Sequence, residues 1–361
     1  MKIAQIAPLI ERVPPKLYGG TERVVSYLTE ELVRRGHEVV LFASGDSITS
    51  ATLVPGAAKA LRLEPSVRDP LPHMLLLMEQ VRKRADEFDV LHFHTDLLHF
   101  PILRPHAGRT VTTLHGRLDL PDLPAFYHEF SDMPVVSISN DQRRPLPHAR
   151  WIATVPHGLP RSITRFYAEP SDGYLAFLGR ISPEKRPDRA IAIAKRAGMR
   201  LKIAAKIDRV DDDYFEREIR PLLDHPLIEW VGEIGERQKP EFLGKALALL
   251  FPIDWPEPFG LVTIEAMACG TPTIAYRRGS VPEVIEHGVS GFIVDDEDGA
   301  VEAVRKVPML DRSGVRECFD RRYTVERMAD DYLRVYQGLA RARSSAHATV
   351  VTPEASSYAW T

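Results

Sequence analysis

Short apolar runs rich in β-branched residues alternate with longer segments of helical period along this chain, and the alternation starts a second time near Tyr174. Such alternation predicts parallel strands with helices packed on both faces of the sheet. In the first half, segment 21–35 has apolar residues at helical spacing and ends at Gly36, a residue type that stops helices. The expected strands of this half are 2–8, 37–43, 89–93, 109–114, 134–139 and 151–155.

The second array repeats this layout through most of the remaining chain. Two successive arrays of near-continuous apolar strands indicate an α/β protein with two Rossmann-like, doubly wound domains that face each other across a cleft. Because ligands of such sheets bind beyond the carboxyl ends of the strands, we expect the site in that cleft. The expected strands are 174–178, 200–204, 227–231, 248–252, 272–275 and 292–294, and the expected helices include 188–197, 212–223 and 240–247.

The domain boundary is expected where periodicity gives way to proline and glycine, between residues 156 and 172. The tail after Leu339 is rich in small residues. We therefore expect an N-terminal domain at 1–160, a second domain at 161–322, a C-terminal helix at 323–340 that packs back on the first domain, and a disordered tail at 341–361.

Composition excludes several classes of protein. With 361 residues, 44% hydrophobic and 27% charged, the chain is long and apolar enough for about two globular domains. Its net charge of −3 disfavours general nucleic-acid binding. Two cysteines give no disulfide framework, no run of about 20 apolar residues is present, and the chain opens on a strand-like run, so we expect a cytoplasmic protein.

The stretch 252–272 is the most informative about function. A strand ending at Pro252 leads into a proline-bracketed loop, and a helix is expected from Leu261 to a stop at Gly270. Glu257 then lies in the loop and Glu265 lies inside the helix. The first-turn amides of that helix favour an anion, whereas the two carboxylates favour hydroxyl donors. Sugar and ribose hydroxyls beside a phosphate satisfy both.

Here the sequence resembles the retaining nucleotide-sugar glycosyltransferases of the GT-B fold, in the family 4-like group also called glycosyl transferases group 1. The resemblance spans residues 1 to about 338 and implies transfer of a sugar from a nucleoside-diphosphate donor with retained anomeric configuration, a hexosyltransferase of class EC 2.4. The motifs that carry it are Glu257 to Glu265 with Glu-Pro-Phe-Gly-Leu and Glu-Ala-Met-Ala-Cys-Gly-Thr-Pro, Gly19-Gly20-Thr21-Glu22, the run from Gly179 to Arg186, and Gly279-Ser280-Val281-Pro282-Glu283.

The resemblance also implies roles for individual residues. The second domain would hold the donor and the first the acceptor, which is a sugar, a glycolipid or a small molecule. Charge that builds on a departing diphosphate requires cations fixed beforehand. The implied catalytic residues are His115, Glu257, Arg180 and Lys185; the implied donor-binding residues are Gly19, Gly20, Arg180, Lys185, Lys206, Glu257, Phe259, Gly260, Leu261 and Glu265.

Within that set, Arg180 and Lys185 would clamp the diphosphate, and Gly20 would allow close approach of the backbone to it. Glu257 would hold hydroxyls of the donor sugar and Glu265 the ribose diol. His115 resembles the active-site histidine that faces donor sugar and acceptor. Lys206 follows the strand at 200–204, where many relatives carry a glycine-rich turn, and is expected to add a second phosphate contact. A further departure is His157-Gly158-Leu159-Pro160 near the interdomain link, where the family commonly has Asn-Gly and a following Asp.

No metal and no cofactor are expected. His92, His94 and His99 cluster, but the spacing offers no further zinc ligand. The acidic run 211–213 is better explained as a helix N-terminus than as a metal site.

Several alternatives to a glycosyltransferase remain at this point. They are a nucleotide-sugar epimerase, a phosphorylase-like enzyme and a non-catalytic nucleotide-sugar-binding homologue. A dehydrogenase is disfavoured because no G-x-G-x-x-G follows either first strand. Segment 74–84 allows two interpretations, a helix packed on the first sheet or an amphipathic helix in peripheral contact with the inner face of the membrane. The sequence does not indicate the oligomeric state.

Overall fold

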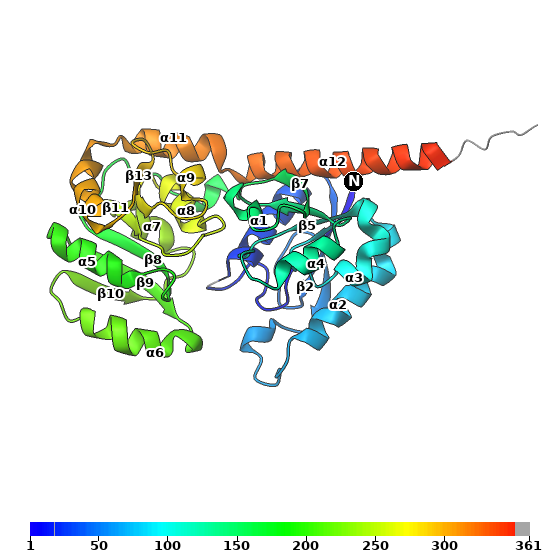
Figure 1. Cartoon of the computed structure of the whole chain (residues 1–361), viewed down its shortest axis with the longest axis horizontal. Coiled ribbons are helices and arrows are strands. Elements are labelled where there is room, and N and C mark those ends of the chain that lie inside the picture. Colours follow the sequence, from blue (N-terminus) through cyan, green and yellow to red (C-terminus); the bar gives the residue numbers. More distant parts are fainter. Residues whose placement is uncertain (18, 351–361) are drawn as a thin grey trace, which may run out of the picture.

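The computed structural model describes residues 1–17 and 19–350, which form two α/β domains arranged along the long axis of the molecule (Figure 1). The first sheet has seven parallel strands in the order β3-β2-β1-β4-β5-β6-β7, and the second has six in the order β10-β9-β8-β11-β12-β13. Two doubly wound domains therefore confirm the fold class expected from the sequence. The strands are β1 Lys2–Ile6, β2 Glu38–Ser44, β3 Thr52–Ala57, β4 Val90–Phe93, β5 Thr110–Thr113, β6 Pro134–Ser137, β7 Arg150–Thr154, β8 Leu175–Ile181, β9 Leu201–Ile207, β10 Ile228–Gly232, β11 Ala248–Phe251, β12 Thr273–Tyr276 and β13 Gly291–Val294.

The near-continuous apolar strands arise because both faces of each sheet are covered. In β1, Ile3 packs into a core with helices α1 and α12, whereas its neighbours Ala4 and Ile6 pack into a separate core with α2. Alternate residues of a strand point to opposite faces, so a strand buried on both sides needs apolar residues throughout. The helices of the first domain are α1 Gly20–Arg34, α2 Leu71–Arg84, α3 Phe100–Leu103 and α4 Leu123–Glu129.

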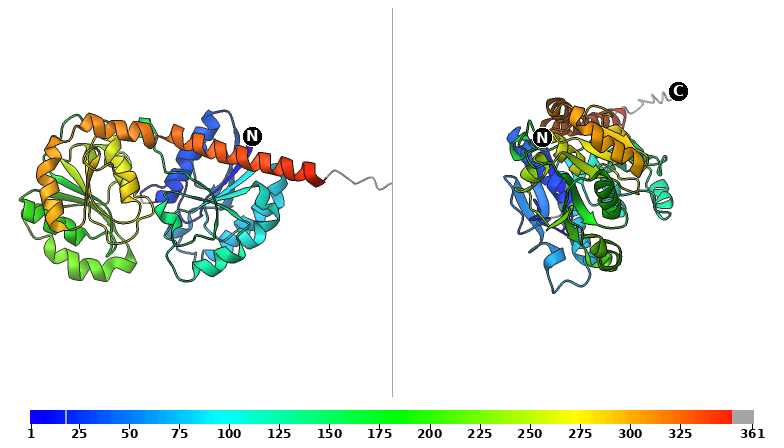
Figure 2. Two further views of the ribbon diagram at one scale, coloured as in Figure 1. Left: turned by 45° about the horizontal axis from the view of Figure 1, so that its top comes forward. Right: turned by 90° about the vertical axis from the view of Figure 1, so that its left-hand side faces the viewer.

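The second domain follows the same plan (Figure 2). Its segment 212–223, expected to be one helix, is instead a turn of α-helix, the π-helical turn Phe215–Ile219 and a final 3₁₀ turn before Leu223. Its helices are α5 Pro187–Ala197, α6 Asp212–Tyr214, α7 Lys239–Gly244, α8 Leu261–Ala268, α9 Val281–Val284, α10 Glu297–Lys306 and α11 Arg312–Arg322.

The edge strand β3 was not expected from the sequence. It pairs with β2 alone, its residues are half-buried or exposed, and it contains Pro55 and Gly56. Proline is tolerated at an edge because no further strand needs its amide. The sequence of β3 therefore lacks the continuous apolar pattern that predicts the central strands, and this is why the strand was not expected.

The chain crosses between the domains twice, and the two crossings are hydrogen-bonded to each other. The Leu159 amide donates to the Tyr323 carbonyl at 2.8 Å, and the Val325 amide donates to the Leu159 carbonyl at 3.0 Å. A Cβ atom at Gly158 would lie 2.2 Å from the Thr324 carbonyl oxygen, so only glycine allows this approach. Both connections therefore pass through one narrow junction.

Helix α12 (Val325–Val350) leaves this junction and runs along the first domain (Figure 1). Met328, Tyr332 and Tyr336 are fully buried against the first sheet and α1. The helix continues past residue 340, so the expectation of disorder was wrong for 341–350, where the backbone is helical. The rest of that expected tail, 351–361, lies outside the described residues. Within residues 1–17 and 19–350, no helix has the length and apolarity needed to cross a membrane.

Candidate active site

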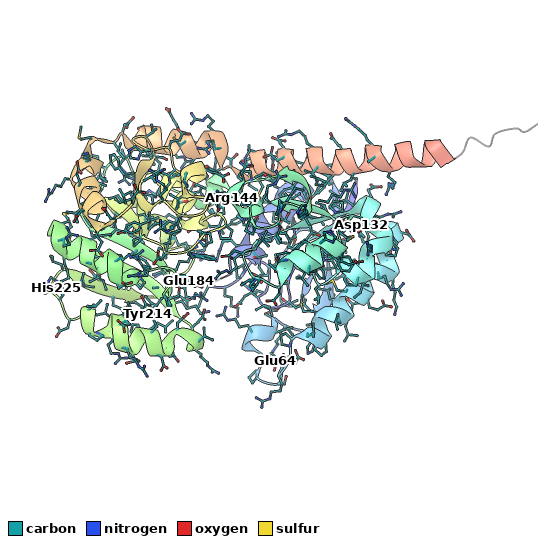
Figure 3. All side chains as sticks on the ribbon, viewed as in Figure 1. Glu64, Asp132, Arg144, Glu184, Tyr214 and His225 are labelled. Carbon is teal, nitrogen blue, oxygen red and sulfur yellow. The ribbon has the colours of Figure 1, made fainter. Side chains whose placement is uncertain are left out.

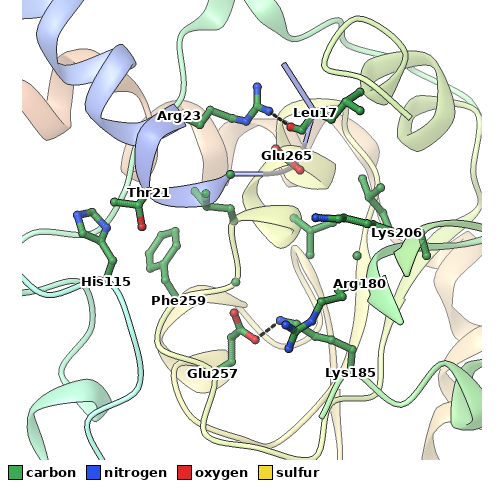
Figure 4. A pocket seen from close by; sticks show the side chains of 18 of the residues that line it. Leu17, Thr21, Arg23, His115, Arg180, Lys185, Lys206, Glu257, Phe259 and Glu265 are labelled. Atoms are coloured by element: carbon green, nitrogen blue, oxygen red, sulfur yellow. Dashed lines mark hydrogen bonds and ion pairs between the residues drawn. The ribbon is translucent and has the colours of Figure 1, made fainter. Parts of the chain in front are cut away.

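A cleft of about 490 Å³ lies between the two domains, a volume suited to a small-molecule ligand. The second domain lines it with the ends of β8 and β9 and the loop before α8, and the first domain with the N-terminal end of α1 and the loop after β5 (Figure 4). The structure brings every residue that the sequence indicated to this cleft. They are Gly19, Gly20, His115, Arg180, Lys185, Lys206, Glu257, Phe259, Gly260, Leu261 and Glu265.

The first charged pair of the cleft joins Lys185 and Glu257 (Figure 4). The Lys185 Nζ donates to Glu257 Oε2 and lies 5.2 Å from the ring centre of Trp255 and 5.6 Å from that of Phe251. Both charged side chains are largely buried, at 18% and 12% exposure. Aromatic faces attract a cation, so these rings add to the stability of the ammonium in the cleft. Trp255 was not among the residues expected from the sequence.

The loop that carries Glu257 is held by the glycine-serine motif after β12. The Ser280 amide donates to the Glu257 carbonyl at 3.0 Å, and Ser280 Oγ donates to the Phe259 carbonyl at 3.0 Å. A Cβ atom at Gly279 would lie 2.4 Å from the Glu257 carbonyl oxygen. This motif therefore fixes the loop from behind while Glu257 faces the cleft.

The Arg180 guanidinium at the end of β8 is surrounded by carboxylates of its own domain. It donates to Glu184 at 3.1 Å and lies 3.7 Å from Asp208 and 3.5 Å from Asp211. Lys206 Nζ lies 2.8 Å from Asp208. Burial raises the pKa of Asp211 above its ordinary value, and the Arg180 charge opposes that rise. The cations expected to bind phosphate are thus matched by carboxylates, which a diphosphate would have to replace.

Glu265 lies one turn inside α8 and accepts a hydrogen bond from Lys239 Nζ at 2.7 Å. Lys239 opens α7 and also lies 3.3 Å from Glu236. Sequence reasoning missed this lysine, because only the fold brings the start of α7 beside α8. The positive charge of Lys239 compensates the negative charge of the buried Glu265 carboxylate, because burying an unpaired charge costs free energy.

The N-terminus of α8 is shaped by Gly260, whose φ of 81° lies in the left-handed region. A Cβ atom there would lie 3.2 Å from the Phe251 ring. Phe259, Gly260 and Leu261 all line the cleft, so the N-terminal end of α8, whose first-turn amides have no partner within the helix, borders it. A helix of this kind favours an anion at its start.

Gly19 and Gly20 both line the cleft, but the fold requires glycine only at the first of these positions. Gly19 has a φ of 150°, and a Cβ atom there would lie 2.8 Å from Pro15, so the fold itself needs this glycine. A Cβ atom at Gly20 would only make an ordinary contact of 3.5 Å with Leu261 Cδ1. Gly20 therefore has no steric reason within the protein to be glycine.

His115 enters the cleft from the loop after β5. Its ring stacks on His157 with centroids 5.3 Å apart, and His157 contacts the Phe259 ring edge to face at 4.9 Å. Burial lowers the pKa of His115 to about 3, so the imidazole is neutral at physiological pH. His157, noted in the sequence as a departure from the family pattern, thus packs beside the expected active-site histidine.

The other histidines of this region bond to protein groups. His92 Nε2 lies 2.8 Å from Thr113 Oγ1, and His99 Nε2 lies 2.8 Å from Thr112 Oγ1. Within the described part of the chain, no three His, Cys, Asp or Glu side chains come together as a metal site.

Ion pairs also cross the cleft between the domains. Arg62 of the first domain donates to Asp208 of the second at 2.6 Å. Arg117 lies 3.8 Å from Glu184, which occupies the face of the second domain directed at the first (Figure 3). The structure therefore holds the two domains together partly through groups that also surround Arg180.

Comparison with known proteins decides the family. The family model described as Glycosyltransferase Family 4 matches residues 18–202, and the one described as Glycosyl transferases group 1 matches residues 164–312. The chain belongs to this family of glycosyltransferases. The resemblance to this family inferred from the sequence motifs is therefore confirmed. Three of the four motifs that carried it contribute residues to the cleft lining, and the fourth, Gly279 to Glu283, supports the loop that carries Glu257.

This glycosyltransferase is 25% identical over 340 residues to D-inositol 3-phosphate glycosyltransferase of Mycolicibacterium smegmatis, covering 78% of the chain and 76% of the relative. It is 26% identical over 364 residues to N-acetyl-alpha-D-glucosaminyl L-malate synthase of Bacillus anthracis, covering 90% and 95%.

Two solved structures show the same fold. AviGT4, a glycosyltransferase involved in Avilamycin A biosynthesis, matches with a TM-score of 0.73 at 24% identity and covers 94% of this chain and 98% of its own. Anabaena Alr3699/HepE in complex with UDP and glucose matches with a TM-score of 0.71 at 18% identity, covering 94% and 100%.

Proposed function

We propose that this glycosyltransferase moves a hexose from a nucleoside-diphosphate donor to an acceptor hydroxyl with retained configuration and without a metal ion. The observation that carries the proposal is that Arg180, Lys185 and the N-terminus of α8 line the same cleft as Glu257 and Glu265. Cations and helix amides suit a diphosphate, and the two carboxylates suit sugar and ribose hydroxyls.

The chemistry demands charge stabilisation at the leaving group. When the bond between the sugar and the diphosphate breaks, negative charge grows on the phosphate, and groups already in place stabilise it without reorganisation. In the proposed complex, Lys185 and Arg180 exchange their carboxylate partners for phosphate oxygens. Glu257, released from Lys185, then accepts a hydrogen bond from the donor sugar. Fixed side-chain cations supply what a divalent metal supplies in other transferases.

The relatives support this assignment of the donor and leave the acceptor open. Alr3699/HepE has been solved in complex with UDP and glucose, and the other two relatives are a D-inositol 3-phosphate glycosyltransferase and an N-acetyl-alpha-D-glucosaminyl L-malate synthase. We assign the donor to the second domain and the acceptor to the first, whose loops are less similar to the family motifs.

The test is a panel of UDP-, GDP- and ADP-sugars measured by ligand-observed NMR and by slow donor hydrolysis, each with and without EDTA. We expect one base to bind, EDTA to change nothing, and Arg180→Ala to abolish hydrolysis. Arg189→Ala is the matched control, because Arg189 also pairs with a carboxylate, Asp254 at 2.9 Å, but does not line the cleft.

Other outcomes would contradict the proposal. Isomerised donor recovered without any acceptor would indicate an epimerase. Tight donor binding with no hydrolysis and no transfer to any acceptor would indicate a non-catalytic binding protein. Loss of turnover with EDTA would exclude the metal-free mechanism, and an inverted anomeric signal in the product would exclude retention.

Peripheral contact with a membrane is a separate proposal. Helix α2 packs Leu77, Met78 and Val81 against the first sheet, as the simpler interpretation of this segment required, yet it leaves Leu75 and Leu76 exposed. Exposed leucines beside a basic C-terminal turn suit a lipid surface. Co-sedimentation with anionic liposomes is expected for the wild type and lost in Leu75→Ser with Leu76→Ser. Equal sedimentation of both would refute it.

A further inference from the structure

A buried chain of hydrogen bonds leads from the cleft into the first domain. His115 Nε2 lies 2.8 Å from His94 Nδ1, and His94 Nε2 lies 2.8 Å from Gln5 Oε1. Gln5 is fully buried in β1, and His94 is nearly so. Of the three, only His115 lines the cleft. Burying a glutamine in the middle of a largely apolar central strand costs free energy unless its amide forms hydrogen bonds. A functional role for Gln5 would explain why the strand carries it.

The direction of each bond follows from the chemistry of the groups. The Gln5 carbonyl oxygen can only accept, so His94 carries its proton on Nε2. A neutral imidazole with a proton on one nitrogen accepts on the other, so His94 Nδ1 accepts. His115 must then donate from Nε2, which leaves a lone pair on its Nδ1. Among the described residues, that Nδ1 atom is buried and has no hydrogen-bond partner.

The amide nitrogen of Gln5, at the other end of the side-chain amide, is also hydrogen-bonded to buried groups. Gln5 Nε2 donates to the Tyr336 hydroxyl at 3.1 Å, and that hydroxyl lies 2.8 Å from His92 Nδ1. His92 Nε2 in turn lies 2.8 Å from Thr113 Oγ1. If the Tyr336 hydroxyl donates to His92 Nδ1, then each hydrogen bond of this series pairs one donor with one acceptor. In this arrangement the Gln5 amide donates to Tyr336 of α12 while its oxygen faces His94.

We propose that Gln5, acting through His94, is a positioning residue that holds His115 as the tautomer protonated on Nε2, so that Nδ1 accepts a hydrogen bond from a hydroxyl of the bound substrate. The inference deepens the proposed function and rests on it for the identity of that substrate, a sugar. Burial lowers the pKa of both His94 and His115, so both rings stay neutral and the tautomer, not the charge, is what the series controls.

The opposite arrangement makes a different prediction about the ligand. If the Gln5 amide were turned around, its NH₂ group would face His94, and His115 would carry its proton on Nδ1. His115 would then donate to the ligand and favour an acceptor such as a phosphate or carboxylate oxygen. The tautomer of His115 therefore distinguishes a hydroxyl partner from an anionic one.

The tautomer is measured directly by long-range proton–nitrogen correlation NMR on the full chain labelled with ¹⁵N-histidine. The His115 signals are assigned by their loss in His115→Asn. We expect the wild type to show a protonated Nε2 and an unprotonated Nδ1. In Gln5→Met, His94 loses its fixed acceptor, so His115 is expected to show both tautomers.

Tyr174→Phe is the matched control. Tyr174 is buried in the second domain, and its hydroxyl donates to the Phe242 carbonyl at 2.5 Å, away from the series and from the cleft. Its loss should leave the His115 tautomer unchanged. With a donor that the panel of sugar nucleotides shows to bind, kcat should fall up to about tenfold in Gln5→Met, the effect of one neutral hydrogen bond, and hardly in Tyr174→Phe.

A wild-type His115 protonated on Nδ1 would overturn the inference, as would an unchanged tautomer in a folded Gln5→Met variant. Thermal unfolding shows whether each variant is folded. If Gln5→Met does not fold, Gln5→Leu takes its place, and a wild-type His115 protonated on Nδ1 overturns the inference without any variant. If the tautomer is as expected but no nucleotide sugar binds, the inference about Gln5 stands and the proposed function fails.

Discussion

Removing the charge of Lys185 while keeping its shape tests the donor clamp most directly. Lys185→Met retains an unbranched apolar stem, which can keep the contacts with Trp255 and Phe251. It removes only the ammonium group, whose present partner is Glu257. Because the side chain lies inside a partly closed cleft at 18% exposure, its charge is screened much less than a surface charge.

The expected loss follows from electrostatics. Two unit charges about 4 Å apart interact by about 4 kcal/mol at an effective dielectric constant of about 20. Measured losses of one preorganised donor to a developing anion are about 3–4 kcal/mol, which corresponds to about 10²–10³-fold in kcat. The unpaired Glu257 carboxylate would also repel the diphosphate, so donor affinity should fall as well. Lys185→Met with Glu257→Gln should recover part of the affinity but not the turnover.

The assay is transfer or slow hydrolysis of the bound donor, with donor affinity measured separately by NMR. Lys245→Met is the control, because Lys245 also pairs with a glutamate, Glu241 at 2.7 Å, on the surface away from the cleft. It should leave kcat unchanged. If Lys185→Met kept kcat within about threefold of the wild type, the assignment of Lys185 to the diphosphate would be refuted.

Three further predictions follow from single contacts. Gly20→Ala should fold normally, since its Cβ meets only Leu261 at 3.5 Å, yet weaken donor binding in a titration; unchanged affinity would remove Gly20 from the site. Burial raises the pKa of Glu22 to about 7 from 4.5, so the native state keeps a proton that the unfolded state releases, and the contribution of this group to stability should fall as pH rises from about 5 to 7. Buried neutral histidines such as His94 and His115 act in the opposite sense, so the test is a difference: the urea-unfolding free energy of Glu22→Gln should rise relative to the wild type by on the order of 3 kcal/mol over that range, and a constant difference would contradict the pKa shift. Arg62→Ala removes the interdomain pair with Asp208 and should lower the calorimetric unfolding temperature slightly at low salt and not at high salt; equal lowering at both would show that charge is not the cause.

The central strands and the position of the site could be predicted from the sequence because their causes are local or follow from the fold class. β1 and β8 are largely apolar because both faces are covered, and Arg180 at the end of β8 and Glu257 after β11 belong to neighbouring parallel strands, whose carboxyl ends meet at one edge of the sheet. The edge strand β3 lacks that signal because one of its sides is free.

The pairing of the charges could not be predicted, because each pair joins segments distant in sequence. Lys239 reaches Glu265 only because α7 packs beside α8, and Arg62 reaches Asp208 only because the domains meet. A sequence also gives no orientation for a buried amide. The amide of Gln5 donates to a hydroxyl of α12 that lies more than three hundred residues further along the chain, at Tyr336.

The route of α12 has a consequence for how this protein is made. The core of the first domain contains Met328, Ala329 and Tyr332 next to Ile3 and Val90, so that domain is assembled from both ends of the chain. When the first 160 residues have left the ribosome, this face of the sheet has α1 but not its second covering helix. The second domain, by contrast, is continuous and is synthesised whole before α12. We therefore expect the later-made domain to complete its core first, the reverse of the usual N-terminal order of folding during synthesis.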